Sequence, residues 1–282
     1  MSVTVRNLLP SDLGVADTIL SSAFQRSGSW FRELSLFLKL QPDGIFLASQ
    51  DGLPAGMVAT ILYSDYAYVG LMGVHRNFQR QGLGMVLMQH VLDQMQAKSV
   101  PVVRLDASPF GQPLYEKLGF VPHEEVYVLQ TQKREMNGQQ PTGIEILTSH
   151  HLDLLASPDF QAFGADRTRL LQALLETYPS RAFLQQNAEG QIHGYLFAQE
   201  KRIGPWVMAG DADPEPLLQA ALSLPFPGPV SIIVPAENRD AISLLQRHGF
   251  ETVRVNRHMS YGSPVPAGQR RQIFGQTSLS MG

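Results

Sequence analysis

The chain has 282 residues, of which 44% are hydrophobic and 17% charged, so it is long enough for two ordinary globular domains. Its net charge of −3 argues against a nucleic-acid partner, and the absence of cysteine excludes disulfides, cysteine nucleophiles and zinc–cysteine sites. The N-terminus lacks the apolar core of a signal peptide, and no apolar run approaches membrane-spanning length. We therefore expect a cytoplasmic protein that acts on neither nucleic acid nor membrane.

The first half of the chain predicts a sheet interrupted by helices. Strands are expected at 3–8, 45–49, 57–63, 66–74, 102–106 and 126–130, and helices at 11–24, 31–38, 83–97 and 114–118. The early strands are joined by a hairpin at Asp51–Gly52, and the later ones by helical crossovers. This order predicts a mixed α/β layer architecture.

The second half repeats the order of the first. Strands are expected at 144–147, 182–186, 193–199, 206–209 and 230–234, and helices at 168–176, 217–222 and 241–246. Leu114–Phe120 matches Leu244–Phe250, and each follows a predicted strand. We predict two copies of one domain at 1–130 and 142–261, with a linker at 131–141 and a C-terminal extension at 262–282.

The turn Gln79–Gly84 reads Gln-Arg-Gln-Gly-Leu-Gly and lies between a predicted strand and a predicted helix. Its glycines allow the backbone to approach a ligand closely, and the helix that follows presents free N–H groups and a positive dipole end. Such a turn suits a phosphate group. A dinucleotide site would need a third glycine and an acidic residue about 20 positions later, and a triphosphate loop would need a lysine. Neither of these sites matches the turn.

With Gly73-Val74 before it and Leu114-Tyr115-Glu116-Lys117-Leu118-Gly119-Phe120 after it, this turn resembles the GNAT superfamily of N-acetyltransferases. The resemblance covers about residues 3–130. It implies a mixed α/β fold and, with the internal repeat, similarity to a bacterial GNAT subgroup that has two tandem GNAT-like acyl-CoA N-acyltransferase domains. It further implies acetyl-coenzyme A as cosubstrate, no metal, and direct transfer of the acetyl group to a primary amine in a ternary complex.

The resemblance also implies which residues hold the cofactor. The amides of the turn would bind the pyrophosphate beside the cation of Arg80, and the backbone at the end of the preceding strand would bind the pantetheine arm and the acetyl carbonyl. Ser108 stands where many members carry an asparagine. For Gly82 and Gly84 the structural alternative is a plain tight turn. The implied cofactor residues are Met72, Gly73, Val74, Gln79, Arg80, Gln81, Gly82, Leu83, Gly84, Met85 and Ser108.

Tyr115 occupies the general-acid position of the family, from which it would protonate the departing coenzyme A thiolate. The alternative is a half-buried packing tyrosine. The general base is left open among His75, Asp65, Asp106 and an ordered water, since each side chain also has a structural role available to it.

Three aromatic residues, Phe24, Trp30 and Phe31, lie where the family commonly covers the acceptor. We expect Phe31 to pack on the sheet, and Trp30 is the better candidate for a lid over the acceptor.

The second copy keeps the predicted shape but lacks the chemistry. Asn238 stands seven residues before Leu245, which replaces the general-acid tyrosine and has no proton to donate. Where the glycine turn would be, the chain carries Asp211 and Asp213, which would cap a helix and repel a diphosphate. We therefore predict one coenzyme A site per chain, and a degenerate second domain that helps to shape the acceptor site.

The acceptor is left open by the sequence. A protein N-terminus, a lysine, a polyamine, an aminoglycoside and an amino acid are all amine-bearing candidates, small molecule or protein. Two alternatives to acetyl transfer remain: a different acyl-CoA donor, and a non-catalytic acyl-CoA sensor. Tyr115 favours the enzyme over the sensor, and nothing in the sequence indicates the oligomeric state.

Overall fold

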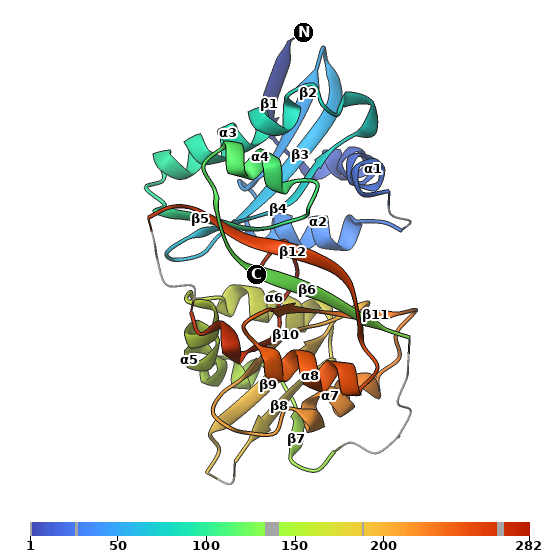
Figure 1. The fold of residues 1–282 in the computed structure, drawn as a ribbon, viewed down its shortest axis with the longest axis vertical. Coiled ribbons are helices and arrows are strands. Elements are labelled where there is room, and N and C mark those ends of the chain that lie inside the picture. The colour runs from blue at the N-terminus through green and yellow to red at the C-terminus, as the bar shows by residue number, and fades with distance from the viewer. Residues whose placement is uncertain (1, 26–27, 133–140, 188, 264–267) are drawn as a thin grey trace. The chain divides into compact units, whose positions relative to one another are not determined.

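The chain forms two compact units in a computed structural model that describes residues 2–25, 28–132, 141–187, 189–263 and 268–282 (Figure 1). The first unit comprises Met1–Pro122, Met259–Val265 and Met281, and the second His123–His258, Pro266–Ser280 and Gly282. Each is a mixed α/β unit, which confirms the predicted fold class. Among the described residues, no helix combines the length and the apolar character needed to cross a bilayer.

The first unit is built on a five-stranded order, β1-β2-β3-β4-β5, in which only β4 and β5 run parallel. The last residues of β12, from Met259, also belong to this unit and lie next to β5. Its strands are β1 (Val3–Asn7), β2 (Ile45–Gln50), β3 (Leu53–Leu62), β4 (Ala67–Val74), β5 (Val102–Ala107) and the end of β12 (Glu251–Gly262). Its helices are α1 (Leu13–Phe24), α2 (Phe31–Leu40), α3 (Leu83–Ala97) and α4 (Gln112–Lys117), with short 3₁₀ turns η1 (Pro10–Asp12) and η2 (Arg76–Phe78).

Helices cover both faces of this sheet. Leu83, Leu87 and Val91 recur along α3 at helical spacing and are buried in one core with strand residues of the same unit. On the other face, Gly73 of β4 lies against Leu20 and Ala23 of α1. The strand β4 is therefore enclosed between two helices, which fixes the position of its C-terminal end.

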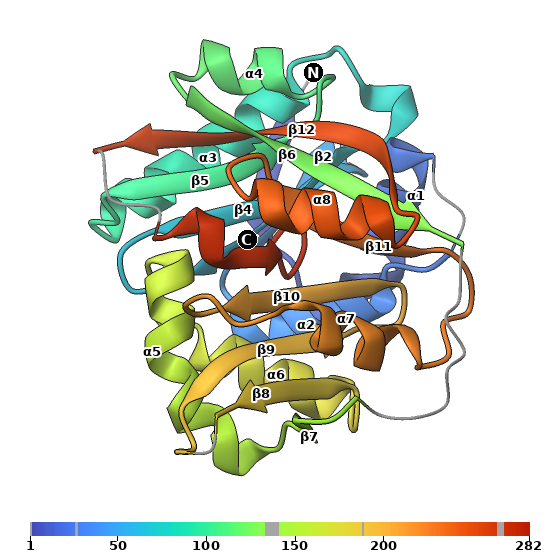
Figure 2. The ribbon, with the colours of Figure 1, turned by 60° about the horizontal axis from the view of Figure 1, so that its bottom comes forward.

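The second unit has the strand order β12-β6-β11-β10-β9-β8-β7, with β13 paired to β10 (Figure 2). Its strands are β6 (Val121–Thr131), β7 (Ile144–Ile146), β8 (Ala182–Gln186), β9 (Ile192–Ala198), β10 (Arg202–Met208), β11 (Val230–Pro235) and β13 (Ile273–Gly275). Its helices are α5 (Leu152–Phe163), α6 (Thr168–Thr177), α7 (Glu215–Leu222) and α8 (Arg239–Arg247), with 3₁₀ turns η3 (Ser149–His151) and η4 (Arg270–Gln272).

The compact units do not coincide with the predicted copies 1–130 and 142–261. The strand β6 was expected to be the last strand of the first copy, but most of it belongs to the second unit. There it pairs with β11, with Val126 opposite Pro235 at one end and Thr131 opposite Val230 at the other. Conversely, Met259 of β12 is fully buried in the core of the first unit. Residues 133–140 of the predicted linker lie outside the described part of the chain.

Some local expectations were wrong. Ser11, expected to cap the first helix, lies inside the 3₁₀ turn η1, and Asp12 is the N-cap residue of α1, which begins at Leu13. Phe31, expected to pack on the sheet, is 45% exposed, because α2 is anchored by residues from Leu34 onward and Phe31 lies one turn earlier. The helix α5 was not expected, since Pro158 stands inside it and proline normally breaks a helix.

A buried ion pair holds part of the second unit together. Arg167 donates two hydrogen bonds to the carboxylate of Asp159, at 3.1 and 2.7 Å, and both residues are almost fully buried. Tyr195 donates to the same carboxylate, and burial raises the pKa of Tyr195 well above its ordinary value. Arg167 Nη1 also donates to Thr277 Oγ1 at 3.1 Å, so the charge network extends to the C-terminal segment.

We predict that Arg167→Ala lowers the free energy of unfolding by about 3–5 kcal/mol, because it leaves the Asp159 carboxylate buried without its counter-charge. The matched control is Arg6→Ala, which breaks another two-bonded arginine–aspartate pair, with Asp12, whose arginine side chain is half exposed. It should cost less than about 1 kcal/mol. Urea denaturation of both variants measures the difference; equal losses would contradict the role given to the buried pair.

Candidate active site

The strands β4 and β5 pair at their beginnings and then part. Their parallel register comprises Ala67 with Val103 and Tyr68 with Arg104. In the described part of the chain, both strands continue past these two pairs toward their carboxyl ends without further pairing to each other. In open α/β sheets, ligands bind in a crevice outside the carboxyl ends of the strands.

A β-bulge in β4 accompanies this divergence. Ala59 of β3 pairs with Gly70, and Met57 pairs with Gly73, so β4 takes three steps where β3 takes two. Leu71 lies within the bulge and has a φ of 48°. An extra residue of this kind re-aims the backbone of the strand, and it does so immediately before Met72–Val74.

Side-chain hydrogen bonds hold the turn after β4. Gln79 Nε2 donates to the Val74 carbonyl oxygen at 3.0 Å, which ties the turn to the end of the strand. Gln81 accepts from Gln50 Nε2 at 2.8 Å and donates to the Asn77 carbonyl oxygen at 3.2 Å. The turn is therefore positioned by its own glutamines.

The turn ends in a helix N-terminus. Gly82 has a φ of 87°, a left-handed conformation that favours glycine, and it is the N-cap residue of α3. Val86 N donates to the Gly82 carbonyl oxygen at 3.1 Å, so the amides of residues 83–85 precede the first bond of the helix. Arg80 is exposed in the same turn. These groups make one face of the turn electropositive.

Tyr115 lies on α4, which follows β5. The turn between them is closed by Ser108, whose carbonyl oxygen and Oγ accept from Gly111 N at 2.9 and 3.1 Å. The ring of Tyr115 meets Phe120 edge-on at 5.7 Å, and Phe120 lies 5.5 Å from Tyr261. Burial raises the pKa of Tyr115 to about 12, so the phenol keeps its proton at neutral pH.

The structure brings the three predicted segments together. A Cβ atom on Gly84 would lie 3.2 Å from both Met72 Cε and Leu114 Cδ2. The end of β4, the first turn of α3 and the helix that carries Tyr115 therefore meet around Gly84. This meeting point, near the carboxyl ends of β4 and β5, is the candidate site.

Other candidates have structural roles or lie apart from this meeting point. His75 Nδ1 accepts from Asn77 N at 3.4 Å and is the N-cap residue of η2, which is the structural role that the sequence left open. Trp30 is partly buried, with its ring 5.3 Å from that of Phe24. Asp17 Oδ1 accepts from Trp30 N at 2.5 Å and fixes the segment between α1 and α2.

Three features of the site were not predicted. The bulge at Leu71 has a signal in the sequence, since Gly70 and Gly73 flank it and glycine inside a strand is typical of a bulge. Phe110 is 75% exposed in the turn between Ser108 and α4, and an apolar residue at such a position could have been noticed. Tyr261 has no local signal, because it comes from the far end of the sequence.

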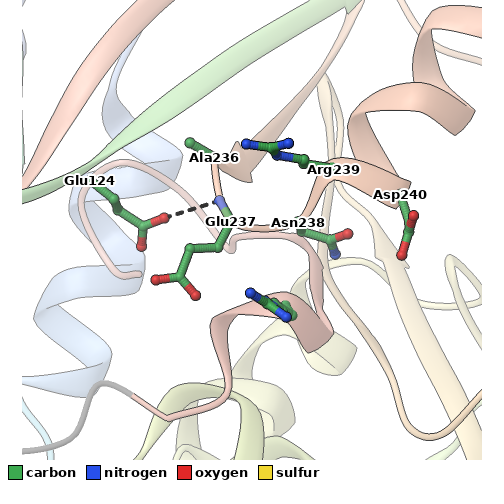
Figure 3. Close-up of a pocket in the computed structure, with 7 residues that line it drawn as sticks. Glu124, Ala236, Glu237, Asn238, Arg239 and Asp240 are labelled. Atoms are coloured by element: carbon green, nitrogen blue, oxygen red, sulfur yellow. Dashed lines mark hydrogen bonds between the residues drawn. The ribbon is translucent and has the colours of Figure 1, made fainter.

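The corresponding end of the second unit is different. A cavity of about 510 Å³ lies at the carboxyl end of β11, lined by Glu124, residues 236–240 and Arg271 (Figure 3). Glu124 pairs with Arg270 and accepts from Glu237 N at 3.4 Å, and burial raises the pKa of Glu124. Three carboxylates line the cavity beside two arginines, so it does not offer the electropositive face that a diphosphate requires.

The second unit also differs from the first at the position of the general-acid tyrosine and before α7. Leu245, which replaces the tyrosine, is fully buried in the apolar core. Pro214, and neither predicted aspartate, is the N-cap residue of α7. Asp213 Oδ1 accepts from Glu215 N at 3.0 Å just before the helix.

Comparisons with known proteins agree with this geometry. Residues 32–130 match a family model described as an acetyltransferase (GNAT) domain, and residues 156–275 match a second model of the same description. The chain belongs to the GNAT acetyltransferase family. It is an acyltransferase of the tandem type, with two GNAT domains in one chain.

Relatives of this GNAT protein are similar over different lengths. The uncharacterized N-acetyltransferase YitH of Bacillus subtilis is 28% identical over 235 residues, 80% of each chain. The crystal structure of a putative acetyltransferase from Pyrococcus horikoshii has a TM-score of 0.87 at 27% identity, covering 99% of this chain and 96% of that one. The [ribosomal protein bS18]-alanine N-acetyltransferase of Escherichia coli is 32% identical over 78 residues, 27% of this chain and 53% of that protein.

We predict that Tyr115 stays protonated at pH 10, where an ordinary tyrosine is half ionised. Burial disfavours the charged phenolate and raises the pKa to about 12, so ionisation moves to higher pH. The tyrosinate absorbance of wild type minus that of Tyr115→Phe should therefore be close to zero at pH 10. A difference that titrates with a midpoint near 10 would show that the side chain is solvated.

Proposed function

We propose that the first unit transfers an acetyl group from acetyl-coenzyme A to a primary amine by direct attack in a ternary complex. The observation that carries the proposal is the meeting of three segments around Gly84: the end of β4, the N-terminus of α3 and the helix of Tyr115. Each segment offers one group that the reaction needs. Because GNAT enzymes use acetyl-coenzyme A as the acetyl donor, we take acetyl-coenzyme A as the cosubstrate.

The diphosphate is assigned to the turn Gln79–Met85. The amides of residues 83–85 lie at the positive end of α3, and the 15-residue helix aligns its peptide dipoles toward them. Arg80 adds an exposed cation in the same turn. Gly82 supplies the left-handed backbone that directs these amides outward.

The pantetheine arm and acetyl group are assigned to the opening between β4 and β5. The backbone of Met72–Val74, re-aimed by the bulge, would hydrogen-bond the arm and the acetyl carbonyl. A donor at the carbonyl stabilises the negative charge that grows on oxygen as the amine attacks. Ser108 accepts from Gly111 N through Oγ, which leaves its hydroxyl hydrogen to donate to the arm.

Tyr115 is assigned as the general acid. The amine nitrogen forms its bond to the acetyl carbon, the carbon–sulfur bond breaks, and the thiolate takes the phenolic proton. A pKa of about 12 ensures that the proton is present at every working pH. The amine loses its own proton to a base that the sequence leaves open, with an ordered water among the candidates.

The acceptor is proposed as an amine on a small molecule or a protein. The name of the Escherichia coli relative specifies an alanine of a ribosomal protein, which supports testing peptides with free N-terminal alanine beside polyamines, aminoglycosides and lysine. The slight acidity of the chain adds little to this choice. The cytoplasmic location stays a prediction.

We predict that Tyr115→Phe lowers kcat by about 10²–10⁴-fold, whereas the Kd for coenzyme A changes little, because the variant loses a proton donor and keeps the ring. Turnover is measured as coenzyme A release with each amine and with acetyl-, propionyl- and succinyl-coenzyme A. Tyr127→Phe is the matched control, since this tyrosine lies on β6 and its hydroxyl donates to Glu125.

Two outcomes would contradict the assignment. Unchanged turnover of Tyr115→Phe would reject the general-acid role. Tight coenzyme A binding without release of coenzyme A in any amine mixture would support the sensor instead.

A further inference from the structure

The second unit repeats the divergence of two parallel strands. The strands β10 and β11 pair at Arg202–Ser231 and Ile203–Ile232, as β4 and β5 pair at two positions. The register of β10 on β9 then shifts between Ile203 and Trp206, so β10 also carries an irregularity just past the pairs. The geometry that opens the cofactor site in the first unit is therefore present a second time.

In the second unit the chain itself fills this opening. The strand β13 pairs antiparallel with β10, Trp206 with Gly275 and Val207 with Ile273. These pairs begin at Trp206, three residues after the last pair of β10 with β11 at Ile203. The C-terminal segment, dark red in Figure 2, runs beside β10 at this point.

The same segment is also bonded to the β11 side. Gln276 N donates to the Ile233 carbonyl oxygen at 2.8 Å, and Asn238 Nδ2 donates to the Ile273 carbonyl oxygen at 2.9 Å. Ile273 and Gln276 are both fully buried. The segment is thus held by hydrogen bonds from both sides of the opening.

The fit at β10 is close. A Cβ atom on Gly204 would lie 2.1 Å from the Gln276 carbonyl oxygen, so a larger residue has no room there. Gln199 Nε2 donates to the carbonyl oxygens of Gly204 and Thr277, at 2.7 and 2.8 Å. Arg167 holds Thr277 from the buried ion pair. The docked strand is built into the unit.

We propose that β13 is an internal occupant that takes, in the second unit, the place of the pantetheine arm in the first. The assignment of that arm rests on the proposed function. Asn238 stands seven residues before Leu245, as Ser108 does before Tyr115. Its side-chain amide donates to the backbone of β13. The second unit has kept the binding opening and has replaced its ligand with a strand of its own chain.

The assignment is tested in the full chain with Gly275→Val. The new side chain would meet the Ile203 carbonyl oxygen and Ile232 Cγ2, since the Cβ position is 3.2 and 3.3 Å from them, and β13 should undock. The control is Gly228→Val, the same change in the second unit, where nothing lies within 4 Å of the Cβ position. Hydrogen exchange of residues 273–276 reports docking.

The probe for the opening is S-acetylpantetheine, which has no diphosphate, observed by saturation-transfer NMR with saturating coenzyme A present to fill the first unit. We expect transfer to the probe in Gly275→Val and none in wild type or Gly228→Val. The proposal is overturned if the undocked variant gives no transfer, if wild type gives transfer, or if residues 273–276 stay protected in the variant.

A milder variant covers the case in which Gly275→Val fails to fold. Asn238→Asp keeps the oxygen that accepts from Ala241 N at the start of α8 and removes the donor to Ile273. It should speed exchange in residues 273–276 about tenfold and leave α8 unchanged. Unchanged exchange overturns the proposal. These exchange readouts do not depend on coenzyme A, whereas failure of wild type to bind coenzyme A would count against the proposed function.

Discussion

The parting of two parallel strands is the constraint on which the site depends. The strands β4 and β5 are tied at Ala67–Val103 and Tyr68–Arg104, and the bulge at Leu71 then turns β4 before its last three residues. This places backbone groups at the edge of an opening instead of in a continuous ladder. The glycine turn follows β4 and the helix of Tyr115 follows β5, so both come directly after a strand that borders this opening.

The two units share the same backbone geometry at the opening but differ in the groups that surround and fill it. In the first, helix α3 begins in an electropositive turn beside the opening. In the second, Asp213 accepts from Glu215 N just before α7, and β13 lies in the opening. The buried Arg167 donates to Thr277, which follows β13. In the second unit, backbone groups of residues 273–276 hydrogen-bond to the strand groups at the opening. In the first unit, a ligand would make the corresponding hydrogen bonds. Duplication of a fold therefore does not require duplication of its ligand.

Local patterns in the sequence predicted local structure well. The turn Gln79–Gly84 and the helix of Tyr115 carry glycine and periodicity signals, so the sequence alone predicts both. The assignment of β6 to the second unit, the burial of Met259 in the first and the docking of β13 depend on pairings between distant segments, which leave no mark at fixed spacing. The sequence did not predict α5, because Pro158 lowers the local helix propensity and tertiary packing maintains the helix.

The central claim is that one opening accepts coenzyme A and the other is closed. Isothermal titration calorimetry of the full chain with coenzyme A measures the number of sites most directly, and Gly82→Val places the site, because a valine at a φ of 87° would distort the turn. The account predicts one site per chain, lost or greatly weakened in Gly82→Val. Two sites per chain, or one site that Gly82→Val leaves at wild-type affinity, would contradict it.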